Sequence, residues 1–431
     1  MYRLNKREQK IFSIALIFTG IIILALALIK PSDIVAQTIL SSENVGEKYV
    51  VVGWNNLGMH CYDSDFSDFA ILPPYNTLMA QVIRVGDPPQ IVTQGIQVRY
   101  EFPENTYSAG RRGRPDKTNF WTYAQTLFDL SAPLPRNIGL TGKGLSGVMD
   151  PAGDYFIAEG IPLTEFRDQD AVNKNRYPYQ MARLTVRTAN GDASTQPILA
   201  SLDVTAPVST EFSCVNCHCD DCDATTAYPI TPTGGVKTNI LTLHDYLNSG
   251  KYATLLMDQR PVLCADCHAS AALGKPGTPG VNSLSNAMHT HHKDLMDITP
   301  DTEGCYNCHP GPVTQCLRDT MSQHFSLNCT NCHGTMETVG QNLQPWLQEP
   351  QCSNSACHGS GYSTDQALYR MSHGHGGIYC SACHDSQHAI APSREANDGL
   401  KFLELQGEPG TLRKCTVCHA TTPDQMFKHS Y

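Results

Sequence analysis

The first half of this 431-residue chain has almost no cysteine: of the 18 in the chain, only Cys61 lies before Cys214. A disulfide framework is therefore excluded from the first half, which has to rely on a conventional hydrophobic core. Positive charge is also scarce, since 31 Lys and Arg face 41 Asp and Glu and the formal net charge is −10. This balance argues against a general nucleic-acid binder, because such proteins neutralise phosphates with a Lys and Arg surface.

The N-terminus carries an export pattern. Arg3, Lys6, Arg7 and Lys10 precede an apolar run, residues 11–29, that contains no charged residue. The run is longer than the ~7–15 residues of a cleaved signal and close to the ~20 that span a bilayer. We expect residues 1–36 to be a signal peptide or a membrane anchor, and the rest to be exported: periplasmic, membrane-anchored or extracellular. No cysteine follows the run closely, so a bacterial lipid anchor is not indicated.

From Cys214 onward the chain repeats one short pattern, in which two cysteines separated by two residues are followed at once by histidine. The six strict copies are Cys214, Cys217 and His218; Cys264, Cys267 and His268; Cys305, Cys308 and His309; Cys329, Cys332 and His333; Cys380, Cys383 and His384; and Cys415, Cys418 and His419. A seventh copy, with Cys352, Cys357 and His358, has four residues between its cysteines. This is the attachment signature of c-type haem: two thiols add to the haem vinyl groups, and the adjacent histidine reaches the iron.

The alternatives to haem are zinc sites and disulfides, but zinc normally takes four protein ligands from paired knuckles. With these motifs, the part from Cys214 to His419 resembles the multihaem c-type cytochromes. The resemblance implies seven covalently attached haems, a compact haem stack and a role in electron transfer. The stretch from Val51 to His60, taken with the haem region, is also similar to large exported cytochromes of metal- and sulfur-respiring bacteria.

Ten of the 17 histidines lie outside the motifs and could supply the second axial ligands. The predicted distal ligands are His60, His244, His289, His292, His324, His373, His375, His388 and His429; the tenth histidine is His291. For each, the alternative is a surface or packed histidine. Met288, Met321, Met371 and Met426 leave open one methionine-ligated haem.

Bis-histidine iron has no vacant coordination site, so it transfers electrons and does little else. We therefore predict an electron carrier with no catalytic residues, which meets redox partner proteins or extracellular acceptors and touches a membrane only through its N-terminal segment. One alternative is a haem-filament subunit in which a histidine such as His60 ligates a haem of the next copy. Another is an oxidoreductase that reduces a small nitrogen or sulfur compound at an open haem. No Cys-x-x-Cys-Lys variant is present.

Four cysteines belong to no motif: Cys61, Cys219, Cys222 and Cys316. In an exported protein, spare cysteines are most often paired, and a Cys219–Cys222 disulfide is our first expectation. A metal site and free thiols remain the alternatives. Because haem propionates would add negative charge to an acidic chain, we expect a basic partner or bound cations.

The chain divides into a polar linker over residues 37–47, a β-rich, sandwich-like domain over 48–210 and a seven-haem domain over 211–431. The β prediction follows from β-branched, partly alternating segments bounded by turn residues, at residues 49–54, 79–85, 90–102, 182–187 and 197–205. The haem domain is expected to have short helices and little regular structure. Helices are predicted over residues 237–251 and 282–296, where they aim His244 and His289 inward. Asp63, Asp65 and Asp68 resemble part of a calcium loop but lack its glycine and final glutamate, so we expect a solvated acidic turn.

Overall fold

The computed structural model describes residues 48–190, 195–294, 303–362 and 364–425. The predicted signal or anchor, the linker over 37–47 and His429 lie outside the described residues. Among the described residues, no helix combines the length and apolar character needed to cross a membrane.

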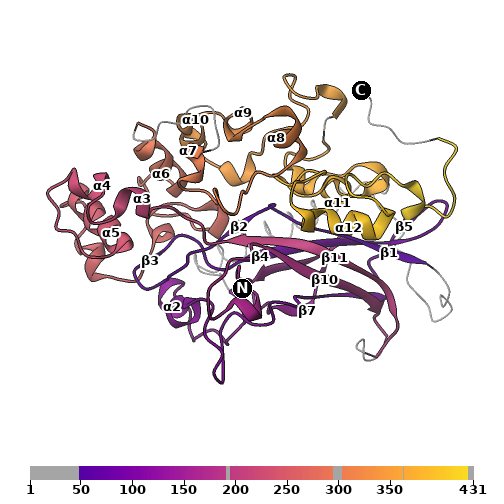
Figure 1. Ribbon diagram of the computed structural model, residues 1–431, viewed down its shortest axis with the longest axis horizontal. Helices are drawn as coiled ribbons and strands as arrows, with labels where there is room; N and C mark the ends of the chain where they lie inside the picture. Colours follow the sequence, from indigo (N-terminus) through magenta and orange to yellow (C-terminus); the bar gives the residue numbers. More distant parts are fainter. Residues whose placement is uncertain (1–47, 191–194, 295–302, 363, 426–431) are drawn as a thin grey trace, which may run out of the picture. The chain divides into compact units, whose positions relative to one another are not determined.

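Two five-stranded sheets form the first part of the chain (Figure 1). The first sheet has the order β1–β4–β9–β8, with β5 paired to β4: β1 (Tyr49–Asn55), β4 (Asn76–Arg84), β9 (Tyr155–Ile161), β8 (Asp150–Ala152) and β5 (Gln90–Ile91). The second has the order β2–β11–β10–β6–β7: β2 (His60–Cys61), β11 (Ile198–Ser209), β10 (Tyr179–Thr188), β6 (Ile96–Glu101) and β7 (Ser146–Val148). Neighbouring strands are antiparallel except β2 and β11, and a small parallel pair joins β3 (Phe69–Ala70) to β12 (Val262–Leu263).

The inward faces of the two sheets share one hydrophobic core. Val51 and Leu78 from the first sheet are fully buried in the same cluster as Val98, Leu184 and Val204 from the second. The sheets approach closely at Gly53, where a Cβ atom would lie 2.4 Å from Leu184 Cδ1. A larger residue at this point of β1 would force the Leu184 side chain to shift, so glycine allows the close approach of the sheets.

The outer face of the first sheet is also buried. Val52, Trp54 and Met79 point away from the shared core and pack in a second cluster with Tyr379 and Val417, which come from the cysteine-rich part. Because both faces are covered, every residue of β1 is buried. The outer face of the first sheet therefore packs against the sixth and seventh Cys-His motifs.

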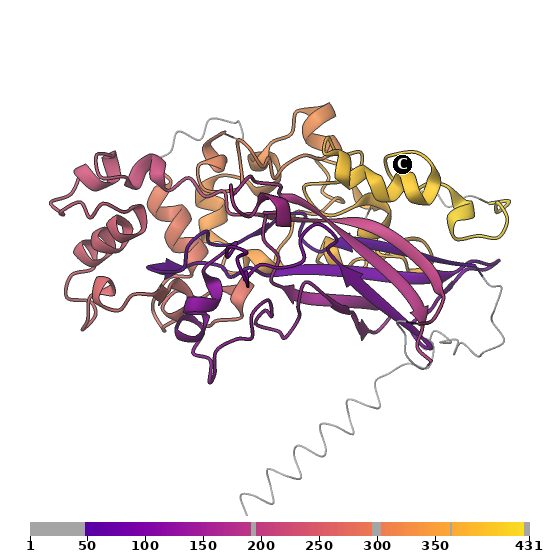
Figure 2. The same cartoon turned by 60° about the horizontal axis from the view of Figure 1, so that its bottom comes forward.

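Short helices make up most of the remaining regular structure, so the prediction of a β-rich first part followed by short helices is confirmed. The α-helices are α2 (Phe120–Leu127), α3 (Val215–His218), α4 (Asp223–Thr226), α5 (Val236–Leu247), α6 (Leu284–His292), α7 (Glu303–Tyr306), α8 (Thr320–Phe325), α9 (Cys329–His333), α10 (Met336–Gln341), α11 (Cys380–His384) and α12 (Ala396–Gln406). The 3₁₀ turns are η2 (Asp168–Asp170), η3 (Leu256–Asp258), η4 (Cys264–Asp266), η5 (Ala271–Leu273), η6 (Pro345–Leu347), η7 (Ser360–Tyr362), η8 (Tyr369–Met371), η9 (His375–Gly377) and η10 (Cys415–Val417). The helices predicted over 237–251 and 282–296 correspond to α5 and α6, which both end four residues earlier than expected. Figure 2 shows α3 to α5 at one end of the long strands and α12 alongside β11.

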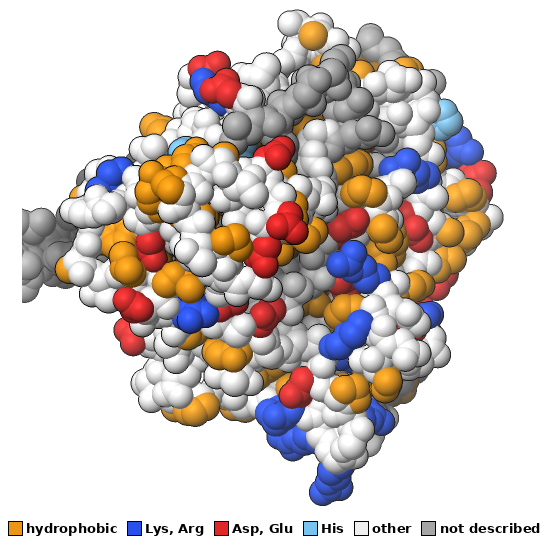
Figure 3. Space-filling model, turned by 60° about the vertical axis from the view of Figure 1, so that its left-hand side comes forward, with side chains coloured by type: hydrophobic (Ala, Val, Ile, Leu, Met, Phe, Trp, Pro, Cys, Tyr) orange, Lys and Arg blue, Asp and Glu red, His pale blue; other side chains and the backbone are white. Residues whose placement is uncertain are grey.

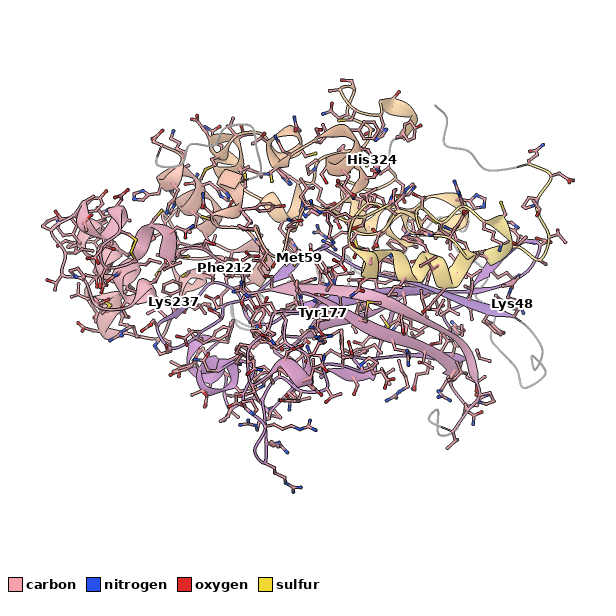
Figure 4. All side chains as sticks on the ribbon, viewed as in Figure 1. Lys48, Met59, Tyr177, Phe212, Lys237 and His324 are labelled. Carbon is pink, nitrogen blue, oxygen red and sulfur yellow. A yellow bond between two sulfur atoms is a disulfide. The ribbon has the colours of Figure 1, made fainter. Side chains whose placement is uncertain are left out.

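The acidic turn of the first part holds the cysteine-rich part in place. Lys237 Nζ of α5, labelled in Figure 4, lies 2.8 Å from both Asp63 Oδ1 and the Phe69 carbonyl. Arg260 makes a 3.0 Å ion pair with Asp68. The expectation of a solvated turn is wrong for Asp63, which is buried and accepts bonds from the backbone N–H groups of residues 71 and 72. The lysine ammonium neutralises this buried carboxylate.

A buried arginine makes a second connection between the two parts. The Arg318 guanidinium binds Asp398 through both carboxylate oxygens, at 2.7 and 3.2 Å, and donates to the Gly58 carbonyl at 2.8 Å. Both charged side chains are almost completely buried. Burying the Arg318–Asp398 ion pair is tolerated only because each charged group has hydrogen-bond partners that offset the loss of hydration.

Candidate functional site

The seven motifs, numbered in chain order, fold into similar tight turns. They begin at Cys214 (motif 1), Cys264 (2), Cys305 (3), Cys329 (4), Cys352 (5), Cys380 (6) and Cys415 (7). In motifs 1, 2, 3 and 7 the histidine N–H donates to the carbonyl of the first cysteine at 2.9–3.0 Å, and motifs 4 and 6 are single helical turns. The longer motif 5 closes in the same way, with His358 N 3.3 Å from the Cys352 carbonyl. The extra residues of motif 5 therefore bulge without changing how its ends meet.

Five of the motif histidines each lie opposite a different histidine from outside the motifs. The ring centroids of these pairs are 6.4 Å apart for His218–His292, 6.2 Å for His268–His244, 6.2 Å for His309–His289, 6.0 Å for His333–His388 and 6.0 Å for His419–His375. Each pair joins one motif to a different partner, so no histidine is shared among them. These partners are all among the predicted distal ligands.

The spacing of these pairs fits two ligands on one iron. A metal–imidazole bond of about 2 Å on each side, plus slightly more than 1 Å from each nitrogen to its ring centre, separates the centroids by roughly 6.3 Å. The interplanar angles vary from 22° to 89°. This variation is compatible with shared ligation because each ring can rotate about its own metal–nitrogen bond. Each pair could thus supply the two axial nitrogens of a haem iron.

Hydrogen bonds at Nδ1 orient several of these rings. His289 and His292 bond through Nδ1 to the carbonyls one helical turn earlier, at 2.7 Å each. The other contacts are His244 to Tyr252 Oη at 3.1 Å, His268 to the Asn282 carbonyl at 2.8 Å, His419 to Asp87 Oδ1 at 3.1 Å, and His388 to Cys316 Sγ at 3.5 Å. A partner at Nδ1 selects the tautomer whose Nε2 lone pair can bind a metal. The supporting residues Tyr252, Asn282, Asp87 and Cys316 were missed by the sequence reasoning, because nothing local marks them.

Burial favours the neutral form of several of the paired histidines, the form that metal binding requires. Burial and the nearby His289 and His333 lower the pKa of His309 from 6.5 to about 4. Burial and the neighbouring His333 lower the pKa of His388 from 6.5 to about 3. On the face shown in Figure 3, histidine contributes little to the surface, whereas acidic and basic side chains are interspersed.

The first four motifs are neighbours in space, although not in chain order. Burial raises the pKa of the thiols of Cys214 and Cys264, and Asp63 acts on both, so motifs 1 and 2 flank the same carboxylate. Asn216 of motif 1 donates to Asn307 of motif 3 at 3.1 Å. A hydrogen bond with Cys305 of motif 3 and burial raise the pKa of Cys329 of motif 4. The resulting order is 2–1–3–4.

The series continues through the remaining motifs. Burial raises the pKa of Cys332 of motif 4, and both cysteines of motif 5 contribute to the effect. Burial and Cys352 of motif 5 raise the pKa of Cys380 of motif 6 to about 11. Burial and Cys418 of motif 7 raise that of Cys383 to about 12. These interactions link the described motifs in the order 2–1–3–4–5–6–7.

Other predicted distal ligands lie in different surroundings. His373 Nδ1 is 2.9 Å from Asp365 and Nε2 is 3.4 Å from Asp154, so both ring nitrogens face carboxylates. His60 is buried with Nε2 3.0 Å from Asn56 Oδ1. His324 is exposed on α8 (Figure 4). The motif 5 histidine, His358, lies 5.1 Å from the ring of Tyr362.

Further features bear on cofactor binding. The predicted disulfide between Cys219 and Cys222 is present, and Cys61 and Cys316 are not disulfide-bonded. Within the described residues, no group of three or more His, Cys, Asp or Glu is placed to hold a metal ion, whereas a haem iron takes two protein ligands.

A cavity of about 760 Å³ opens beside His419, within the size range of cofactor sites. Lys48 and Lys414 are among the residues that line it.

Comparisons with protein-family models, curated proteins and solved structures found no match for this chain. Its function is therefore inferred from the motifs and from the surroundings of their histidines.

Proposed function

We propose that this chain is a multihaem c-type cytochrome that relays electrons outside the cytoplasm, in respiratory or extracellular electron transfer. The two cysteines of each motif would hold one of seven haems, and the following histidine would supply an axial nitrogen. When bound, such haems supply one-electron redox chemistry.

The set of five histidine pairs is the observation that carries this proposal. Each pair is spaced for two axial bonds, and the orienting contacts fall on Nδ1. Two histidines on each iron would leave no coordination site for a substrate and would favour electron transfer. The unbroken order of the motifs supports a relay, because electrons would pass between neighbouring sites from motif 2 to motif 7. Redox partners would then dock near these two ends.

The proposal is tested by producing the full chain in a host that attaches c-type haem. We expect seven haems per chain by pyridine haemochrome assay and intact mass, and predominantly low-spin ferric iron. Replacing Cys264 and Cys267 together by alanine should remove one haem. The matched control, which replaces the disulfide cysteines Cys219 and Cys222 by serine, should retain all seven.

Two results would contradict the relay. If the chain produced in such a host carried no haem, it could not relay electrons as proposed. A large high-spin fraction that shifts on adding nitrite, hydroxylamine or sulfite would favour the reductase instead.

A further inference from the structure

Cys316 is a cysteine outside the motifs that lies beside a paired histidine. Its Sγ atom is 3.5 Å from His388 Nδ1, within the range of hydrogen bonds to sulfur. His388 is also paired with His333 of motif 4, whose ring centroid lies 6.0 Å from that of His388. Cys316 thus contacts the ring nitrogen that would not face the iron.

The backbone holds this contact in place. His388 has a φ of 63°, a left-handed conformation that is uncommon for residues other than glycine. Arg318 donates from its backbone N–H to the His388 carbonyl at 2.8 Å and from its side chain to the Cys316 carbonyl at 3.1 Å. Because Asp398 anchors the buried Arg318, the two partners of the sulfur contact are tied to one rigid group. Unfavourable backbone conformations kept by such surroundings often mark functional positions.

We propose that Cys316 is a positioning residue for His388, whose sulfur accepts a hydrogen bond from Nδ1–H and thereby sets the reduction potential of the motif 4 haem. This inference rests on the proposed function. A neutral imidazole that binds iron through Nε2 carries its proton on Nδ1 and donates it to an acceptor. The acceptor makes Nε2 a stronger electron donor, which stabilises ferric iron and lowers the potential. Motif 4 is the middle member of the series, so its potential would influence transfer along the whole relay.

The test uses the full haem-loaded chain and the variants Cys316→Ala, Cys316→Ser and Cys61→Ala. Redox titration followed by haem absorbance and electron paramagnetic resonance reports the potential and spin state. We expect Cys316→Ala to keep seven low-spin haems and to shift one haem to higher potential. Cys316→Ser retains an acceptor and should return that potential toward the parent value. The matched control is Cys61→Ala, because Cys61 is the other cysteine that belongs neither to a motif nor to the disulfide. This variant should leave all potentials unchanged.

Three results would overturn the inference: unchanged potentials in Cys316→Ala, equal shifts in the alanine and serine variants, or a Cys61–Cys316 disulfide found by peptide mapping of the parent. Should Cys316→Ala not accumulate, Cys316→Val fills similar space without an acceptor and takes its place. Failure of the proposed function is distinguishable, because the parent itself would then lack haem.

Discussion

The ring of Trp54 on β1 lies 5.2 Å from the ring of Tyr379, the residue immediately before motif 6. The contact links a strand from the start of the described chain to a Cys-His motif near its end. Trp54 is fully buried in the cluster that joins the first sheet to motifs 6 and 7. The β-sheet and the motifs are therefore parts of one packed structure.

Replacing Trp54 by alanine should destabilise this junction strongly. Removing a large buried aromatic side chain leaves a cavity and costs about 3–5 kcal/mol. Chemical denaturation should show this loss in the free energy of unfolding. Trp54→Phe should cost much less, because it keeps an aromatic ring and removes an indole N–H that has no hydrogen-bond partner among the described residues. Equal losses in the two variants would show that ring packing is not what Trp54 contributes.

If the relay is correct, replacing His289 by alanine should convert one haem of seven from low-spin to high-spin. His289 faces His309 at 6.2 Å, so the variant would remove one axial nitrogen from the motif 3 iron. The matched control is His373→Ala, since both ring nitrogens of His373 face carboxylates. Electron paramagnetic resonance of the oxidised proteins should show a high-spin signal in the first variant alone. A high-spin signal in the His373 variant instead would reverse the two assignments.

Breaking the Arg318–Asp398 pair on one side should be costly. Arg318→Met leaves the buried Asp398 carboxylate without its partner, and such losses are about 3–5 kcal/mol. The double variant Arg318→Met with Asp398→Leu should recover part of the loss, because no unpaired charge remains. Denaturant unfolding of the two single variants and the double variant measures the coupling. A strictly additive double variant would mean that the pair does not act as a unit.

Acid should weaken the fold through His60. Burial lowers the pKa of His60 from 6.5 to about 4, so the unfolded chain binds this proton more readily than the folded one. The contribution to stability is therefore fully present above pH 6.5 and is lost as the pH falls toward 4, by roughly 3 kcal/mol at most. His60→Gln cannot titrate and should show a smaller decline in unfolding free energy between pH 7 and 4. A decline as steep as the parent's would assign the pH dependence to other groups.

Local sequence was sufficient for several features. β-branched, partly alternating segments predicted β1, β4, β6, β10 and β11. Burial alternates clearly in β6 and β10, where one side chain in two faces the core shared by the sheets. The helices that carry His244 and His289 were predicted, and so was the Cys219–Cys222 disulfide, whose partners lie three residues apart. The outer cluster of Trp54 and Tyr379 was not predicted, because it joins segments that are far apart in the chain.

The sequence by itself determined the number and composition of the Cys-His motifs, since haem attachment depends on residues that are adjacent in the chain. It also determined which histidines were available as partners for them. Only the tertiary structure decided that His292 pairs with motif 1 while His289, one helical turn earlier, pairs with motif 3. It likewise decided that Cys214 of motif 1 and Cys264 of motif 2 are both close enough to Asp63 to be affected by its charge, and that Cys316 contacts His388. These relationships depend on distances between segments that packing brings together, and no spacing within the chain encodes them.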